Sequence, residues 1–255
     1  MKKIYKYLLN TLPRPLLIRL SYIFKVFAPF AYYGKNVHCP VCERDFRKFL
    51  SYGSNKAHRE NVLCPYDLTL ERHRLMWLYL KTTDFFKAKS LKVLHIAPEQ
   101  CFYPIFKEQK NLKYTTADLE SPIADLHFDL HQIPLKDNSY DVIICNHVLE
   151  HVEDDLKCMK ELYRVMKPGG WGIFQVPIDY NNQKTYEDKS ITDPKERELH
   201  FWQKDHLRLY GLDYPSKLQK GGFNIEIFDP RKSLNNINYD KLKLNPKELI
   251  FIAKK

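Results

Sequence analysis

The sequence predicts an α/β fold: a doubly wound, mostly parallel sheet with a small helical and cysteine-rich appendage at the N-terminus. Short apolar runs alternate with segments of helical periodicity, and residues 139–177 read as strand, loop, helix, turn and strand. One βαβ unit of that kind belongs to a parallel sheet. At 255 residues and 44% apolar content, the chain can bury one main core beside the appendage.

The central βαβ unit is predicted from three adjacent patterns. Residues 142–145 form an apolar run rich in β-branched types, which suits a strand buried on both faces. Residues 156–166 repeat their apolar side chains at spacings of three and four, as one face of a helix does. Residues 168–170, Pro-Gly-Gly, end that helix, and residues 171–176 are the next strand.

Polar side chains follow the central strand at the edge where ligands of open parallel sheets bind. They are Asn146, His147, Glu150 and His151. An Asp-Val-Ile-Ile strand, this polar edge and a Lys-Pro-Gly-Gly turn, in this order, resemble the second half of class I S-adenosylmethionine-dependent methyltransferases, in the branch that methylates small molecules. The resemblance implies a Rossmann-like sheet of seven strands, with one antiparallel strand near the C-terminus, and S-adenosylmethionine as cofactor. The alternative is a doubly wound domain with an unrelated ligand.

Basic charge is concentrated in the N-terminal third. The formal net charge is +10; residues 1–92 hold 18 Lys and Arg against 6 acids, whereas the rest hold 23 against 25. Residues 1–37 read as a basic amphipathic helical arm, which either docks in the plane of an anionic membrane or packs on the core. Its apolar run is too short and too charged to span a bilayer. Six irregularly spaced cysteines without a signal peptide predict a cytoplasmic protein, peripheral at the inner membrane face if the arm docks there.

Residues 38–67 contain a zinc-knuckle-like pattern. The four candidate ligands are Cys39, Cys42, Cys64 and Asp67. Two thiolates spaced as C-x2-C chelate one tetrahedral ion, and a carboxylate oxygen is an acceptable further ligand. His38, His58 or His73 could replace Asp67, which could instead cap the following helix; the cysteines could also be reduced, buried and metal-free. A zinc ion here would be structural, because a short, polar, loop-rich segment needs a staple.

The first strand of the main domain is predicted at residues 91–97. By the resemblance, an acid and three glycines should follow this strand around the methionine part of the cofactor. This chain has His95 at the position of the acid, and Ala97, Glu99 and Cys101 at those of the glycines. We expect Glu99 to supply the missing carboxylate for the ammonium group of the cofactor, with Ala97 beside it. The alternative is that cofactor binding is lost.

The resemblance also assigns the remaining cofactor contacts. They fall on Asp118, Leu119, Asp129, Leu130 and Asn146. Asp118 would accept hydrogen bonds from the ribose hydroxyls, and Asp129 would bind the adenine amino group, with Leu130 against the ring. Asn146 would hold the cofactor or the loop backbone. Asp129 could instead be a turn or capping acid.

The main domain is predicted over residues 68–255, with an insertion or lid at residues 178–215. Its further strands are expected at residues 112–117, 126–130, 223–228 and 249–253. The lid interleaves titratable groups with aromatic residues, which is typical of an acceptor pocket, or it forms an amphipathic helix with solvated charges. The candidate acceptor-binding residues are His151, Asp205, Arg208 and Tyr210. Histidine can remove a proton from an oxygen acceptor near pH 7, and His147 and His206 are the candidate bases.

Two functions from different classes follow from these patterns. The first is methyl transfer by direct displacement to a small-molecule or lipid-linked acceptor, which the order of the motifs favours. The second is a nucleic-acid-binding protein with a zinc knuckle and a methyltransferase-like domain that is non-catalytic or modifies RNA. The altered first loop and the basic N-terminal third favour the second function. The sequence shows no dense surface of aromatic and basic residues, which makes nucleic acid the less favoured partner.

Overall fold

The computed structural model describes residues 16, 27–28, 30–53, 58–235 and 237–255. The predicted arm at residues 1–37 lies largely outside the described residues, and so does its predicted membrane contact. The chain divides into two compact units: Met1–Leu78 with Asn236–Lys247, and Tyr79–Asn235 with Glu248–Lys255. Within the described part of the chain, no helix is both long and apolar enough to cross a membrane.

The first unit is built from two antiparallel hairpins and short helical segments. Its elements are β1 (Val37–Cys39), β2 (Arg44–Phe46), β3 (Leu50–Tyr52), β4 (Arg59–Leu63), the start of α3 (Glu71–Thr82), and α9 (Tyr239–Leu242). Arg74 of α3 is completely buried and donates hydrogen bonds to the carbonyl oxygens of Val62, Thr69, Leu242 and Lys243. Because all these acceptors are backbone atoms, one guanidinium group joins the second hairpin to the segment that carries α9.

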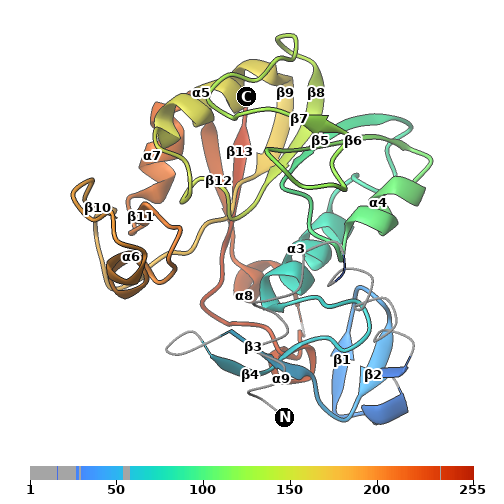
Figure 1. Ribbon diagram of the computed structural model, residues 1–255. Coiled ribbons are helices and arrows are strands. Elements are labelled where there is room, and N and C mark those ends of the chain that lie inside the picture. The colour runs from blue at the N-terminus through green and yellow to red at the C-terminus, as the bar shows by residue number, and fades with distance from the viewer. Residues whose placement is uncertain (1–15, 17–26, 29, 54–57, 236) are drawn as a thin grey trace. The chain divides into compact units, whose positions relative to one another are not determined.

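The second unit contains the seven-stranded sheet. In chain order its strands are β5 (Leu91–Ile96), β6 (Leu112–Asp118), β7 (Leu126–His127), β8 (Tyr140–Cys145), β9 (Met166–Ile173), β12 (Asn224–Phe228) and β13 (Ile250–Lys254). Their spatial order is β12-β13-β9-β8-β5-β6-β7 (Figure 1). β5 to β9 pair in parallel, whereas β13 is antiparallel to both of its neighbours. The predicted Rossmann-like sheet with one antiparallel strand near the C-terminus is confirmed.

Helices and one small hairpin complete the second unit. They are α4 (Tyr103–Glu108), α5 (Asp155–Val165), α6 (Pro194–Phe201), α7 (Tyr214–Lys220), α8 (Pro230–Ser233), and the pair β10 (Tyr186–Glu187) and β11 (Arg208–Leu209). α5 starts where the side chain of Asp154 accepts a hydrogen bond from Lys157 N at 2.9 Å. Its apolar face buries Met159, Leu162 and Val165 in the main core, and α7 lies beside it (Figure 1).

Two element boundaries differ from the prediction. α5 ends at Val165 because Met166 is already extended, and Pro-Gly-Gly lies inside β9 rather than in a turn before it. The β8–β9 register shifts between Tyr140 and Val142, which accommodates this segment. β7 has only two residues, because Asp129 turns the chain by accepting a hydrogen bond from His131 N.

Candidate functional site

The carboxyl ends of β5, β6 and β8 meet at one edge of the sheet, because these strands are parallel neighbours. Glu99 follows β5, Asp118 ends β6, and Asn146 and His147 follow β8. The structure therefore brings together four side chains that the sequence places in three separate segments.

The carboxylate of Glu99 is fixed by two neighbouring side chains. His95 Nε2 lies 2.5 Å from Glu99 Oε2, and Asn146 Nδ2 donates to Glu99 Oε1 at 3.2 Å. The other ring nitrogen of the buried His95, Nδ1, lies 2.8 Å from the hydroxyl of Tyr114. Burial raises the pKa of Tyr114, so its protonated phenol can donate to Nδ1 and leave Nε2–H to donate to Glu99. This chain of contacts orients an anionic group at the sheet edge.

The loops after β5 and β8 both place a non-glycine residue in the left-handed region. Ala97 has φ of 49° and His147 has φ of 55°. Ala97 N donates to Ala117 O at 2.8 Å, and His147 N donates to Gln175 O at 2.7 Å, which holds both residues in place. A left-handed conformation costs a non-glycine residue on the order of 1–2 kcal/mol. Ala97 thus adopts a backbone conformation that glycine would adopt without strain.

The other predicted cofactor contacts lie at the ends of β6 and β7. Asp118 Oδ1 accepts hydrogen bonds from the amides of Glu120 and Ser121, so a ligand at this edge would meet Oδ2. Leu119 is 65% exposed, which leaves an apolar side chain uncovered beside Asp118. Asp129 uses Oδ1 to hold the turn to His131, and the backbone amide of His131 holds the pKa of Asp129 below its usual value. Leu130 is buried.

Three histidines surround Glu150 in the segment that follows β8. We call His147, Glu150, His151 and His206 the Glu150 cluster. Glu150 Oε1 lies 3.3 Å from His147 Nδ1 and 4.0 Å from His206 Nε2. Glu150 and His206 are each 1% exposed, whereas His147 and His151 are partly exposed. Burial raises the pKa of Glu150, but contact with His147 and the charges of His147 and His151 outweigh it, so its net pKa is lowered.

The two candidate bases differ in access. His147 is partly exposed at the sheet edge. His206 is buried, its Nδ1 lies 2.8 Å from Phe201 O, and burial lowers its pKa. His147 therefore keeps part of its ring exposed, although its Nε2 atom is buried, whereas the whole side chain of His206 is buried.

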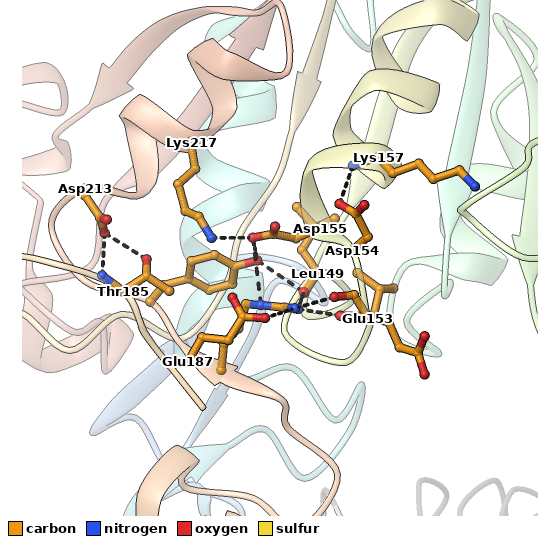
Figure 2. Close-up of polar contacts among 12 residues, drawn as sticks. Leu149, Glu153, Asp154, Asp155, Lys157, Thr185, Glu187, Asp213 and Lys217 are labelled. Carbon is orange, nitrogen blue, oxygen red and sulfur yellow. Dashed lines mark hydrogen bonds and ion pairs between the residues drawn. The ribbon is translucent and has the colours of Figure 1, made fainter. Parts of the chain in front are cut away.

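Arg208 and Tyr210 lie inside the fold rather than on an open pocket wall. The Arg208 guanidinium donates to the carbonyl oxygens of Leu149, Val152 and Glu153 and to the Glu187 carboxylate; Tyr210 donates to Leu149 O and to Asp155. Figure 2 shows Lys217 of α7 and Glu187 of β10 directed into the same network. The side chains of Arg208 and Tyr210 therefore hold the loop between β8 and α5. Of the other two predicted acceptor residues, His151 Nδ1 lies 3.2 Å from the carbonyl oxygen of the exposed Asp205.

The predicted zinc ligands converge in the first unit. One donor atom from each of Cys39, Cys42, Cys64 and Asp67 lies within 4.8 Å of the others. Cys42 Sγ and Cys64 Sγ are 3.9 Å apart, and two sulfurs on a tetrahedral zinc, each about 2.3 Å from it, are separated by about 3.8 Å. Burial and Cys39 raise the pKa of Asp67 to about 6.

The two carboxylate oxygens of Asp67 have different partners, one in the following backbone turn and one in the cysteine cluster. Oδ1 accepts from Thr69 N at 2.9 Å, while Oδ2 lies 3.0 Å from Cys39 Sγ. Asp67 is therefore not the N-cap of α3, which begins four residues later at Glu71. His73 Nδ1 accepts from Leu70 N, while His38 contacts Asp45 and His58 contacts Gly53. These histidines are outside the cluster, so the donor set is three thiols and one carboxylate.

Sequence reasoning missed three residues that complete these sites. Tyr114 and Gln175 were unassigned, although each lies on or next to a strand that reaches the site edge. Glu150 was noted only as an edge residue. Its position three residues after His147 and directly before His151 was the available signal, because helical or turn spacing places such residues together.

Comparison with known proteins agrees with this architecture. Residues 91–174 match the family model described as "Methyltransferase domain". Demethylmenaquinone methyltransferase of Staphylococcus epidermidis is 43% identical over 58 residues, which are 23% of this chain and 24% of that protein. The Listeria monocytogenes protein of the same name is 38% identical over 58 residues, with the same coverage. The chain thus spans about a quarter of the length of the curated relatives it matches.

The solved structures similar to this chain include methyltransferases at low sequence identity. An S-adenosylmethionine-dependent methyltransferase from Mesorhizobium loti is 14% identical, with a TM-score of 0.46 over 70% of this chain and 97% of that chain. The CurJ carbon methyltransferase is 12% identical, with a TM-score of 0.44 over 71% and 52%. On the family match, this chain carries a methyltransferase domain, and the predicted resemblance is confirmed.

Proposed function

We propose that this protein transfers a methyl group from S-adenosylmethionine to a small-molecule or lipid-linked acceptor. The observation that carries the proposal is the Glu99 carboxylate, fixed by His95 and Asn146 at the carboxyl edge of the parallel sheet. Asp118 presents a second carboxylate at the end of the adjoining strand β6. The matched methyltransferase family supports the choice of ligand.

The donor set at this edge fits the chemistry of the cofactor. Glu99 would pair with the ammonium group, and Asp118 would accept the ribose hydroxyls through Oδ2. The exposed side chain of Leu119 would lie against the adenine, and Asp129 would bind the adenine amino group. S-adenosylmethionine supplies a methyl group on a sulfonium, whose leaving group is already activated. The protein therefore needs mainly to position the acceptor and to remove its proton.

His147 is the better of the two candidate bases. Its ring is partly exposed beside Asn146, and its Nδ1 lies 3.3 Å from Glu150 Oε1. The Glu150 carboxylate beside Nδ1 would help to orient the ring, and Nε2, which is buried without a hydrogen-bond partner within the described residues, would accept the acceptor proton once a substrate reaches it. Arg208 and Tyr210 would act as positioning residues, because they fix the loop that carries Glu150.

The relatives favour a small-molecule acceptor. The matched curated proteins are named for demethylmenaquinone, and the match to them covers 58 residues. We further propose a structural Zn²⁺ on Cys39, Cys42, Cys64 and Asp67, since three thiolates and a carboxylate at these distances suit a closed tetrahedral site.

Calorimetric titration with S-adenosylmethionine and S-adenosylhomocysteine tests the proposed cofactor site. We expect micromolar binding, which corresponds to about −8 kcal/mol. Asp118→Ala should abolish measurable binding, and Glu99→Gln should weaken it by roughly tenfold or more, since it removes one charge-assisted contact. Glu108→Gln, an exposed glutamate at the end of α4, is the matched control and should bind as the wild type does.

Two results would refute the proposed cofactor site. One is the absence of binding by folded wild-type protein. The other is equal affinity in Glu99→Gln, Asp118→Ala and the Glu108→Gln control, which would place the cofactor elsewhere.

A further inference from the structure

We propose that Glu150, His151 and His206 form a second metal site, which binds a first-row transition-metal dication such as Zn²⁺. One oxygen or nitrogen from each residue lies within 4.8 Å of the other two. This site is separate from the cysteine cluster. The methyl transfer proposed above gives no role to the buried imidazole of His206. The proposal does not depend on S-adenosylmethionine binding.

Glu150 carries the argument because its carboxylate is buried and accepts no hydrogen bond within the described residues. Glu150 is 1% exposed, and within the described residues neither Oε1 nor Oε2 accepts a hydrogen bond. The nearest donor is His147 Nδ1 at 3.3 Å, outside hydrogen-bond geometry. A buried carboxylate that accepts no hydrogen bond is stabilised by a cation held against it. A bound dication would satisfy both oxygens.

His206 is oriented as a metal-binding histidine is. Its Nδ1 faces Phe201 O at 2.8 Å, so Nδ1–H donates and the lone pair belongs to Nε2. That Nε2 is buried, has no hydrogen-bond partner within the described residues, and lies 4.0 Å from Glu150 Oε1. Metal-ligating histidines usually donate their second N–H to a carbonyl or carboxylate in this way.

His151 supplies the third donor from the open side of the site. Its ring meets the ring of His206 at right angles, with centroids 4.7 Å apart. Two imidazoles on one tetrahedral ion, each with a metal–nitrogen distance near 2.0 Å, have centroids roughly 5 Å apart. Asp205 O lies 3.2 Å from His151 Nδ1 and holds this ring in place. The two rings are therefore already spaced for a shared ion.

The donor set selects the kind of ion. Two imidazoles and one carboxylate suit Zn²⁺ and its first-row neighbours, whereas Mg²⁺ and Ca²⁺ prefer oxygen ligands. Three protein ligands leave a fourth tetrahedral position. His151 is partly exposed, so that position is open to water or to a small ligand.

Metal content of the full chain tests the site. Protein loaded with Zn²⁺ and passed into metal-free buffer should retain one more equivalent of zinc per chain than Glu150→Gln or His206→Gln, measured by mass spectrometry of the metal. Glu153→Gln, an exposed glutamate three residues along, is the matched control and should retain the wild-type content. Glu150→Gln is nearly isosteric and removes a buried charge, so this variant should fold even if His206→Gln does not.

Cobalt substitution separates the two metal sites. Only cysteine thiolates give strong sulfur-to-cobalt charge-transfer absorption in the near ultraviolet. In Glu150→Gln we expect that absorption to stay at its wild-type intensity while the cobalt content falls by one equivalent. Equal metal content in wild type and Glu150→Gln would overturn the proposal, and so would loss of the thiolate absorption together with the metal. Neither readout uses S-adenosylmethionine, so failure of the methyl-transfer proposal would leave these results unchanged.

Discussion

Asp155 joins α5 to α7 and to Tyr210, the residue directly after β11. Its Oδ2 accepts from Lys217 Nζ and Tyr210 OH, both at 2.8 Å (Figure 2). Burial raises the pKa of Asp155, but the hydrogen bond and charge of Lys217, together with Arg208 and Tyr210, outweigh it and lower the net pKa. A carboxylate whose folded pKa is lowered stabilises the protein fully above its unfolded pKa, near 4, and loses that contribution as pH falls through the folded value.

Asp155→Asn should therefore destabilise the protein in a pH-dependent way. At pH 7 we expect a loss of about 3 kcal/mol in the free energy of unfolding, because the substitution leaves the partly buried Lys217 ammonium without its carboxylate. As pH falls from the unfolded pKa near 4 toward the lowered folded pKa, the loss should shrink, because the unfolded state takes up a proton that the folded carboxylate does not yet bind. Urea unfolding at pH 7 and at pH 3 measures both values. Asp84→Asn, an exposed aspartate, is the control; an unchanged gap at the two pH values would contradict the account.

His147 gives the second prediction at the scale of one residue. If it removes the acceptor proton, His147→Gln should lower kcat by roughly 10²- to 10⁴-fold while the affinity for S-adenosylmethionine stays within about twofold. Steady-state kinetics and calorimetry on the same preparation measure the two quantities. His127→Gln, an exposed histidine on β7, should retain wild-type kcat. A parallel loss of cofactor affinity would instead assign His147 to cofactor binding.

At the scale of the element, two glycines of β9 are required for different reasons, one for lack of space and one for its backbone conformation. A Cβ at Gly172 would lie 2.7 Å from Ile143 O of β8 and 2.8 Å from the ring of Phe174. Gly172→Ala should cost about 2–3 kcal/mol of unfolding free energy, because neither the sheet backbone nor the packed ring can move away. Gly169→Ala meets no atom within 4 Å but has φ of 77°, so it should cost only about 1 kcal/mol. Urea unfolding compares them, and equal costs would show that the clash at Gly172 relaxes.

The sequence predicted which strands and helices form, but it predicted the residues at which they begin and end less well. Apolar runs and helical periodicity located the sheet strands and α5 because those patterns reflect burial of one face or both. The end of α5 and the start of β9 were displaced because Pro-Gly-Gly, a local helix-breaking signal, is here paired as part of a strand with a register shift. β7 is shorter than predicted because the chain turns at Asp129, whose side chain accepts a hydrogen bond from His131 N.

At the scale of the whole molecule, we expect the two compact units to differ in their response to metal removal. Chelation of zinc from the cysteine cluster should increase amide hydrogen exchange in β1 and β2, which flank Cys39 and Cys42. β5 and β6 should keep their protection, because they belong to the seven-stranded sheet of the other unit. Hydrogen-exchange mass spectrometry with and without chelator measures this. Cys64→Ser should reproduce the exchange pattern and Cys101→Ser should not; wild-type exchange in fully zinc-free protein would contradict a structural role.

The sequence by itself determined the order of strands and helices, the parallel sheet, and the polar residues that end its strands. These follow from local periodicity and from the fixed direction of parallel strands. It also placed Glu99 where a carboxylate was missing. Only the tertiary structure decided which atoms meet: Glu99 with His95 and Asn146, Asp67 Oδ2 with Cys39, and Glu150 with His206. The physical reason is that such contacts depend on strand register, loop path and burial across distant segments, which no local pattern of side chains encodes.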